Sequence, residues 1–258
     1  MDLQNKTVIL TGASQGIGRA AAYKFIEAGC NVALVARSQS LIKQLAADPG
    51  RAKTLPLPAD LSDLGVCDRV VKETLDRFGQ VDILVNNAAV GIYGPSHTAL
   101  LTEVRKVMQL NFFSPLALTR ACIPPMKANG GGLIINISSI IGQRATPWAG
   151  GYCASKAALE HLVESMRVEL TPDNIRFSTL YPGVTQTGFT RNALGKTKTA
   201  QGRVSGVSAK RVAAKLMYVA QKEPRDAYVT LLDRLFVMGG HLLPSVVDWA
   251  FQRYFQPH

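Results

Sequence analysis

Tyr152 and Lys156 are the residues whose types and spacing point most directly to chemistry in this 258-residue sequence. They stand four positions apart at the start of a segment with helical spacing of apolar residues. Side chains at i and i+4 share one helix face, so the phenol and the ammonium group are expected to be neighbours. A free phenol has a pKa of about 10, and a nearby cation favours the phenolate. The pair could therefore donate a proton to a carbonyl oxygen or accept one from an alcohol.

Two upstream polar residues decide how this pair is interpreted, since the same spacing also occurs on exposed helices without any chemical role. Ser139 follows the predicted strand that contains residues 134–137 and precedes Tyr152 by 13 positions. At the carboxyl end of a strand, its hydroxyl could polarise a substrate oxygen from the side opposite the phenol. Asn111 lies inside a predicted helix, where asparagine is unfavourable. It could hold a water behind Lys156 or make a hydrogen bond in the core.

A glycine-rich turn lies between a predicted strand at 7–11 and a helix that begins at residue 16. Glycines let the backbone approach a pyrophosphate closely, and the positive end of the following helix attracts the anion. The strand-to-helix position supports this interpretation over one in which the glycines serve only a tight turn. The residues predicted to contact a dinucleotide here are Gly12, Ser14, Gln15, Gly16, Ile17 and Gly18.

Arg37 directly follows the second predicted strand and indicates which dinucleotide binds. In dinucleotide-binding folds an acidic residue near this point holds the ribose 2′-hydroxyl, whereas a basic residue accommodates a 2′-phosphate. The segment 35–38 contains no acid, and a guanidinium can hold phosphate through two parallel hydrogen bonds. The sequence therefore favours NADP(H) over NAD(H), the alternative being that Arg37 is a surface residue.

Residues after the third and fourth predicted strands extend this cofactor site. Asp60, followed by Leu61, comes after the third strand, where a carboxylate could accept from an adenine amino group or cap a helix. Asn87 and Ala88 come after the fourth strand. Small residues there would let the backbone lie against the adenosine, while asparagine side chains tie neighbouring strands together.

Short apolar runs alternate along the chain with segments of helical periodicity. Strands are expected at 7–11, 31–36, 54–57, 82–86, 133–138 and 175–180, and helices at 16–28, 38–47, 64–78, 103–127 and 152–170. Apolar strands separated by helices predict a parallel sheet covered on both faces, with ligands beyond the carboxyl ends of the strands. The predicted fold class is α/β, a doubly wound parallel sheet in a single domain over residues 1–258.

The composition fits one folded domain and excludes a disordered protein, since the chain is 47% hydrophobic and 18% charged. The cysteines show no metal-ligand spacing, so no metal site is predicted, and they are interpreted as reduced thiols: Cys30, Cys67, Cys122 and Cys153. Cys153 could be reactive or packed inward. The sequence near residue 1 lacks the long apolar stretch of a secretory signal, so a cytoplasmic location is expected.

The net charge of +11 could attract an anionic cofactor or a phospholipid surface, or could simply be solvated. No nucleic-acid-binding module accompanies it, so no nucleic-acid partner is expected.

Two segments interrupt the strand–helix alternation. Residues 185–207 are polar and aperiodic, which predicts a substrate loop or lid. Residues 231–258 form an apolar tail, whose stretch 235–247 lacks Asp, Glu, Lys and Arg but is too short and interrupted to span a bilayer. The tail could make peripheral contact with a membrane, cover the substrate pocket or pack in a dimer.

Taken together, these motifs resemble the short-chain dehydrogenase/reductase family in order and spacing over residues 6–187. The resemblance implies a Rossmann-type domain, here with an apolar C-terminal extension, that binds a nicotinamide cofactor. It implies Tyr152 as the acid/base group and Ser139 as the residue that stabilises the substrate oxygen. Lys156 would also bind the nicotinamide ribose, and Asn111 would complete a proton relay.

The segment that follows the sixth strand is similar to the family's segment beside the nicotinamide, and the residues implied there are Pro182, Gly183, Val184 and Thr187. Arg37 matches the position that is basic in NADP(H)-preferring members. The chain departs from the family at Ala89, where glycine is usual, and at its end, where an expected strand at 228–232 runs into the apolar tail instead of Asp-Gly-Gly.

The tail is similar to those of members that act on steroids, retinoids or other lipids. The resemblance thus implies an NADP(H)-dependent oxidoreductase that interconverts a carbonyl and an alcohol on a small apolar substrate, as a homodimer or homotetramer built through the helices around Asn111 and Tyr152. The alternative is a non-enzymatic NADP(H)-binding sensor or scaffold.

Overall fold

The computed structural model describes residues 1–47, 53–195 and 206–255. Within these ranges seven strands form one parallel sheet, in the spatial order β3 (Thr54–Pro58), β2 (Asn31–Ala36), β1 (Thr7–Thr11), β4 (Ile83–Asn86), β5 (Gly132–Ile137), β6 (Ile175–Tyr181) and β9 (Asp226–Tyr228). Two short strands, β7 (Thr185–Gln186) and β8 (Val207–Ser208), pair separately. The predicted α/β fold class, a doubly wound parallel sheet, is confirmed.

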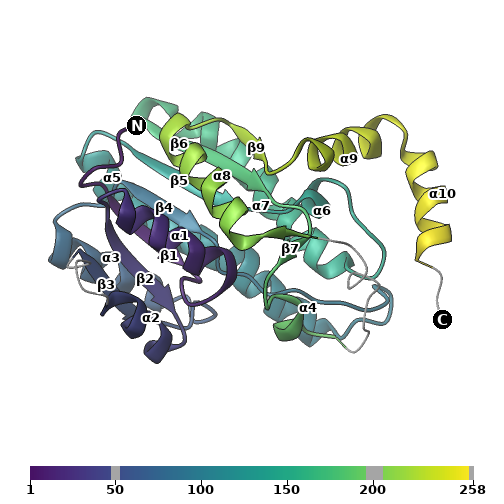
Figure 1. The fold of residues 1–258 in the computed structure, drawn as a ribbon, viewed down its shortest axis with the longest axis horizontal. Coiled ribbons are helices and arrows are strands. Elements are labelled where there is room, and N and C mark those ends of the chain that lie inside the picture. The colour runs from purple at the N-terminus through teal and green to yellow at the C-terminus, as the bar shows by residue number, and fades with distance from the viewer. Residues whose placement is uncertain (48–52, 196–205, 256–258) are drawn as a thin grey trace.

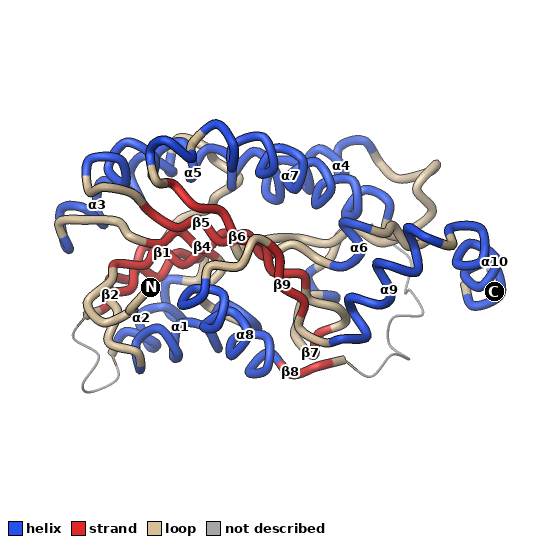
Figure 2. The backbone as a smooth tube through the Cα atoms, turned by 90° about the horizontal axis from the view of Figure 1, so that it is seen from above, coloured by secondary structure: helices blue, strands red, loops and turns tan. Residues whose placement is uncertain are grey.

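The helices that connect the strands cover both faces of the sheet (Figure 2). One layer contains α1 (Gly16–Glu27), α2 (Gln39–Ala46) and α8 (Ala209–Lys222), and the other contains α3 (Val66–Phe78), α4 (Leu101–Met108), α5 (Ser114–Ala128) and α7 (Gly150–Glu169). Alternate residues of β1 belong to the two cores: Val8 and Leu10 pack with Phe25 of α1, whereas Ile9 packs with Val70 of α3. Strands buried on both sides must be apolar throughout, which explains their continuous hydrophobic runs.

The strand order reverses between β1 and β4, which are direct neighbours in the sheet although the chain forms β2 and β3 between them. Connections leave this point toward opposite edges of the sheet, so a crevice opens beyond the carboxyl ends of the central strands. The expected pinning of strands by asparagine is confirmed there, since Asn86 Nδ2 donates to Asn136 Oδ1 at 3.0 Å between β4 and β5.

The prediction of a single helix over 103–127 is wrong, because the chain forms α4, a π-helical turn at Gln109–Phe113 and then α5. The π-helical turn contains Asn111, whose side chain bonds the backbone of Val90. Widened turns of this kind occur most often at functional sites.

The prediction of a strand over 228–232 is also wrong. The strand ends at Tyr228, and Thr230 then begins α9 (Leu231–Leu242) with a capping box in which Thr230 and Asp233 exchange side-chain-to-backbone hydrogen bonds. The tail continues as α10 (Pro244–Tyr254). Figure 1 shows α9 leaving the sheet edge after β9 and α10 lying at the far end of the molecule.

Candidate functional site

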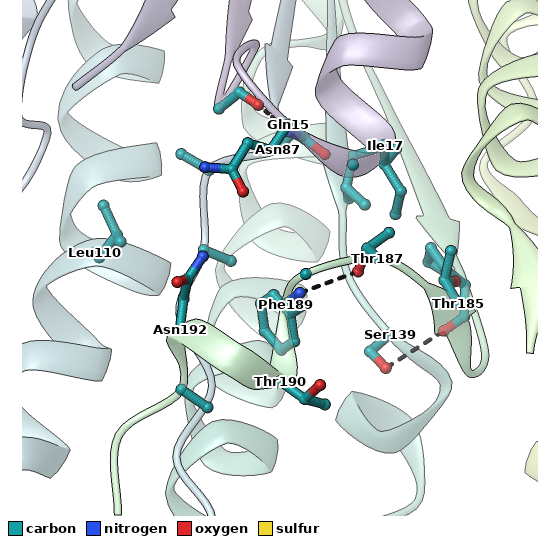
Figure 3. A pocket seen from close by; sticks show the side chains of 18 of the residues that line it. Gln15, Ile17, Asn87, Leu110, Ser139, Thr185, Thr187, Phe189, Thr190 and Asn192 are labelled. Carbon is teal, nitrogen blue, oxygen red and sulfur yellow. Dashed lines mark hydrogen bonds between the residues drawn. The ribbon is translucent and has the colours of Figure 1, made fainter. Parts of the chain in front are cut away.

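A pocket of about 980 Å³ lies beyond the carboxyl ends of the central strands, where the doubly wound fold predicts it (Figure 3). Every residue predicted for the site lines this pocket except Gly18 and Asn111. The lining thus brings together Gly12, Ser14, Gln15, Gly16, Ile17, Arg37, Asp60, Leu61, Asn87, Ala88, Ser139, Tyr152, Lys156, Pro182, Gly183, Val184 and Thr187. These positions are far apart in sequence but meet because parallel strands end at one edge of the sheet.

The glycine turn between β1 and α1 is shaped for close approach of another backbone or ligand. Gly12 and Gly16 have φ angles of +65° and +53°, in the left-handed region that glycine tolerates. The turn is tied to the end of β4, because Asn87 Nδ2 donates to the carbonyl of Thr11 at 2.8 Å. The Gln15 side chain makes no capping bond to α1, which leaves the amide groups of that helix end available to an anion.

Gly18 supports the turn from behind, since a Cβ there would overlap the carbonyl oxygen of Gly12 and lie 2.6 Å from Asn87 Nδ2. We expect Gly18→Ala to displace the turn and to raise the Kd for NADPH at least about tenfold, or ~1.4 kcal/mol. Fluorescence titration with NADPH measures this. Gly239→Ala is the matched control, because a Cβ at Gly239 of α9 meets nothing within 4 Å. An unchanged Kd in Gly18→Ala would contradict the assignment of this turn.

The outer end of the pocket carries the residues predicted for the adenosine. Arg37 is exposed directly after β2, and the neighbouring Ser38 also lines the pocket. Asp60 Oδ1 accepts from the backbone amide of Ser62 at 3.0 Å in a local turn, and the N-cap of the following helix α3 is Gly65, so Asp60 does not take the helix-capping role that the sequence offered as an alternative. The other carboxylate oxygen of Asp60 is a hydrogen-bond acceptor, and the guanidinium of Arg37 can bind an anion at this end of the pocket.

The inner end of the pocket contains the predicted catalytic side chains, held between the end of β5 and the first turns of α7. Tyr152 and Lys156 are both buried, with 7% and 3% of their surface exposed. Lys156 Nζ donates to the carbonyl of Ile137 at 2.8 Å and lies 5.8 Å from the centre of the Tyr152 ring. The i and i+4 positions therefore share one helix face, and that face points into the pocket.

The ionisation of this pair is governed mainly by burial. Burial raises the pKa of the Tyr152 phenol, while a hydrogen bond with Ser139 lowers it. Burial lowers the pKa of Lys156 to about 8, and the charge of Glu160 opposes this shift. The net direction of the Tyr152 pKa is opposite to the one expected from the lysine spacing, because loss of water outweighs the hydrogen bond with Ser139. A neutral phenol at pH 7 is poised to donate its proton.

Asn111 does not face the pocket, and its side chain makes the core hydrogen bonds that the sequence offered as an alternative. Its Oδ1 accepts from the amide of Val90 and its Nδ2 donates to the Val90 carbonyl, both at 2.9 Å. Nδ2 also donates to Ser155 Oγ at 3.0 Å, and Ser155 donates in turn to the carbonyl of Tyr152. Asn111 thereby connects the loop after β4 to the turn of α7 that carries Tyr152, whereas its part in a proton relay stays a prediction.

The segment after β6 forms the wall opposite the glycine turn. The carbonyl of Pro182 accepts from Ser139 Oγ at 3.3 Å, which joins this segment to the end of β5. Thr187 lies beside Gly16, where a Cβ would be 3.1 Å from its methyl group. Of the predicted substrate loop at 185–207, residues 196–205 lie outside the described residues.

An apolar wall around Tyr152 was not among the predicted site residues. The Phe189 ring stands edge-on to the Tyr152 ring, with centroids 5.5 Å apart. Ile92 and Leu194 form an isolated parallel bridge that joins the substrate loop to the loop after β4. We call Tyr93, Ile141, Phe189, Ala193 and Leu194 the apolar wall, since all of them line the pocket. In sequence these residues are scattered apolar positions without periodicity, so only the fold reveals them.

The cysteines give no sign of redox or metal chemistry in the described structure. All four are buried free thiols, and burial raises the pKa of Cys30 to about 12 and that of Cys67 to about 11. Burial also raises the pKa of Cys153, which favours the packed rather than the reactive interpretation. Among the described residues no group of three or more His, Cys, Asp or Glu side chains could hold a metal ion.

Comparison with known proteins agrees with this geometry. The family model described as short chain dehydrogenase matches residues 6–198. The chain is 34% identical to a dehydrogenase/reductase SDR family protein 7-like of Anopheles gambiae, covering 97% of this chain and 83% of that one. It superimposes with a TM-score of 0.85 on a short-chain dehydrogenase from Streptomyces avermitilis, at 29% identity and 98% coverage of each chain.

Two further solved structures carry different dinucleotides. An alcohol dehydrogenase from Thermococcus sibiricus, complexed with 5-hydroxy-NADP, has a TM-score of 0.77 and 27% identity, covering 87% of this chain and 95% of that one. A 3-ketoacyl-(acyl-carrier-protein) reductase from Brucella melitensis, complexed with NADH, has a TM-score of 0.80 and 25% identity, covering 88% and 97%. The fold and the family match together establish that this chain belongs to the short-chain dehydrogenase family of oxidoreductases.

Proposed function

We propose that the protein is an NADP(H)-dependent oxidoreductase that interconverts a carbonyl and an alcohol on a small apolar substrate. The observation that carries the proposal is the convergence of Ser139, Tyr152 and Lys156 at the inner end of a pocket whose outer end is a glycine turn at a helix N-terminus. The turn supports a dinucleotide, because it leads into a helix N-terminus without a side-chain cap, where the backbone amides can hold a pyrophosphate.

When bound, the nicotinamide supplies or accepts the hydride. The protein's own residues handle the proton and the oxygen. Ser139 donates a hydrogen bond that orients and polarises the carbonyl oxygen. Tyr152, neutral because it is buried, gives its proton to the same oxygen in reduction and regains it in oxidation. Lys156, fixed by the Ile137 carbonyl, provides a positive charge that stabilises the phenolate left behind.

Arg37 supports NADP(H) rather than NAD(H) as the cofactor. Its guanidinium is exposed at the pocket's outer end, beside the hydroxyl of Ser38 and directly after β2. A 2′-phosphate placed there would gain a bidentate charge-assisted contact, whereas a 2′-hydroxyl would gain much less.

The apolar wall supports an apolar substrate. Phe189 and Ile141 both pack around Tyr152, so the side of the phenol that faces the pocket is lined by hydrocarbon and an aromatic ring. A substrate that buries apolar surface here gains about 25 cal/mol per Å² removed from water. This lining also excludes water from the proton transfer, which strengthens each polar contact within the site.

A carbonyl screen tests the proposed function. Oxidation of NADPH, followed by absorbance, would be measured with ketosteroids, retinal, long-chain ketones and small aldehydes, and with NADH as the cofactor control. Turnover of an apolar carbonyl with NADPH is the expected result. Tight NADPH binding without turnover of any carbonyl would instead favour a sensor or scaffold.

A homodimer or homotetramer is part of the proposal. Large apolar side chains are exposed on the helices that surround the site, among them Leu101 on α4 at 72% and Val168 on α7 at 76%. Such residues on neighbouring helices fit an interface between two copies of the chain. Light scattering after gel filtration measures the mass, and a monomer at micromolar concentration would contradict it.

The tail supports peripheral contact with an anionic membrane. Among the described residues no helix is long and apolar enough to cross a bilayer. Yet α9 and α10 expose several apolar side chains, here called the tail face: Leu231, Leu235, Met238, Leu242, Val246 and Trp249. The acidic groups of these helices are engaged elsewhere, since Asp233 caps α9 and Asp248 pairs with Arg144. Arg253 stacks on Trp249 at 3.6 Å, a pairing suited to the boundary between headgroups and acyl chains.

We expect Val246→Glu with Trp249→Glu to reduce binding to phosphatidylglycerol vesicles at least about tenfold, since each buried apolar side chain contributes ~1.5–3 kcal/mol. Cosedimentation measures it. The matched control is Ser245→Glu with Gln252→Glu, which adds the same charge at exposed polar positions of α10. If the unaltered protein stays in the supernatant, the membrane contact is wrong. A change in oligomer mass in the variant would indicate a subunit interface instead.

A further inference from the structure

Glu160 of α7 has a half-buried carboxyl group that the proposed mechanism does not use. It follows Lys156 by one helical turn on α7, as Lys156 follows Tyr152, so three successive turns present these side chains on one side of the helix. Acidic side chains are seldom placed away from water unless they are paired or hydrogen-bonded. We therefore expect a group in the folded protein that bonds the Glu160 carboxylate.

The end of β5 provides the partner. Three consecutive residues there engage three successive turns of α7. The Ile137 carbonyl accepts from Lys156, Ser139 bonds the Tyr152 phenol, and between them Ser138 Oγ donates to the carboxylate of Glu160. Ser138 is itself buried. The Ser138–Glu160 pair thus repeats, one turn farther along, the contacts that hold the catalytic residues.

Gly142 of α6 (Ile140–Gln143) closes over this pair. A Cβ at Gly142 would overlap the Glu160 carboxylate and would lie 2.9 Å from Lys156 Cβ and 3.2 Å from Ser138 Oγ. The three side chains therefore share one small space, into which α6 fits only because residue 142 is glycine. Ser138 and Lys156 are buried and Glu160 is half-buried, so the charges interact at a lower effective dielectric than in water.

We propose that Glu160 is a positioning residue that, held by Ser138, keeps Lys156 charged and in place beside Tyr152. Glu160 does not line the pocket, so it would act on the reaction through the neighbouring residues that do, chiefly Lys156. The kinetic consequences rest on the proposed function, whereas the effect on Lys156 does not.

The pKa shifts of Lys156 and Glu160 have the directions that the proposal requires. Burial lowers the pKa of Lys156 to about 8, and Glu160 is the group that raises it. Burial raises the pKa of Glu160 to about 7, while the Ser138 hydrogen bond and Lys156 lower it. The other ionisable groups that interact with Glu160 from its surroundings are His161, Asp226, Tyr152, Tyr181 and Tyr228. Above pH 7 the carboxylate supports the ammonium, and its loss leaves only burial, which favours the neutral amine.

Titration of Lys156 tests the proposal without any substrate. The protein is labelled with carbon-13 at the lysine side chains, and the Lys156 signal is assigned by its loss in Lys156→Met. In Glu160→Gln we expect the titration midpoint of Lys156 to fall by about one pH unit, a tenfold loss of proton affinity. Glu164→Gln is the matched control, since Glu164 lies one turn farther on α7 and is exposed beside Arg225. It is expected to leave the midpoint unchanged.

A second variant guards against misfolding of the first. Ser138→Ala keeps the carboxylate but removes its donor, and the Lys156 midpoint is expected to move in the same direction by a smaller amount. In carbonyl reduction, the alkaline fall of kcat/KM is expected to shift to lower pH by about one unit in Glu160→Gln and not in Glu164→Gln. An unmoved Lys156 midpoint in folded Glu160→Gln and Ser138→Ala would overturn the proposal. Absent turnover with a shifted midpoint would overturn only the proposed function.

Discussion

Replacing Tyr152 with phenylalanine is expected to lower kcat for carbonyl reduction by about 10²–10⁴-fold, the range that a positioned general acid contributes. The substitution removes only the hydroxyl, so the ring keeps its edge-on contact with Phe189 and its packing against the apolar wall. The affinity for NADPH is expected to stay within about twofold, because the glycine turn and Arg37 lie at the other end of the pocket. Steady-state kinetics and fluorescence titration measure the two quantities.

The control for this variant is Tyr254→Phe, which removes a phenolic hydroxyl from an exposed position on α10, away from the pocket. It is expected to retain full activity. A Tyr152→Phe variant with unchanged kcat would show that the proton comes from another group, and the chemical role of the Tyr152–Lys156 pair would then be wrong.

Replacing Arg37 with aspartate is expected to lower kcat/KM for NADPH by about 10²–10³-fold while leaving kcat/KM for NADH unchanged or higher. A charge-assisted hydrogen bond to phosphate contributes about 1.5–3 kcal/mol, and an introduced carboxylate adds repulsion. The same carboxylate can accept from a ribose 2′-hydroxyl, which is how NAD-binding folds hold that group. Initial rates with both cofactors measure the change in preference.

Arg105→Asp makes the same change of charge at an exposed arginine of α4, away from the dinucleotide pocket. It therefore separates local recognition from the general attraction of a +11 protein for anions. A preference for NADH in the unaltered protein, or equal loss of NADPH activity in both variants, would contradict the assignment of Arg37.

The sequence predicts the central sheet well because both faces of it are covered. Strands such as β1 and β2 are uninterrupted apolar runs bounded by polar or glycine turns, and their predicted bounds agree with the structure. The pocket could be predicted for a related reason. Residues that follow parallel strands meet at one edge, so Gly12, Arg37, Asn87 and Ser139 had to lie close together once the strands were known.

The division of the predicted helix at 103–127 could not be read from periodicity, because α4, the π-helical turn and α5 continue almost in line. At the widened turn the Asn111 side chain bonds the backbone of Val90, a long-range contact that periodicity does not reveal. The end of β9 likewise depends on the capping box of Thr230 and Asp233, which begins a helix directly after the strand. Leu231 and Leu232, which follow Thr230, are apolar and resemble strand residues in sequence.

The sequence placed Phe189, Ala193 and Leu194 within the substrate loop predicted at 185–207, but it did not indicate that they form an apolar wall beside Tyr152. Phe189 and Leu194 acquire their place from a bridge to the loop after β4, a long-range contact without a sequence signature. The raised pKa of Tyr152 was also unexpected, since spacing reveals a neighbouring lysine but not the depth at which the phenol is buried.

The most direct test of the central claim is transfer of deuterium from [4,4-²H₂]NADPH, labelled at both C4 positions, to a carbonyl substrate, read by mass spectrometry of the alcohol product. The unaltered protein is expected to place one deuterium on the carbinol carbon, and Tyr152→Phe is expected to do so at least about 10²-fold more slowly while still binding NADPH. Tight NADPH binding with no deuterium in any product would contradict the account and leave the protein a dinucleotide-binding member of its family without this chemistry.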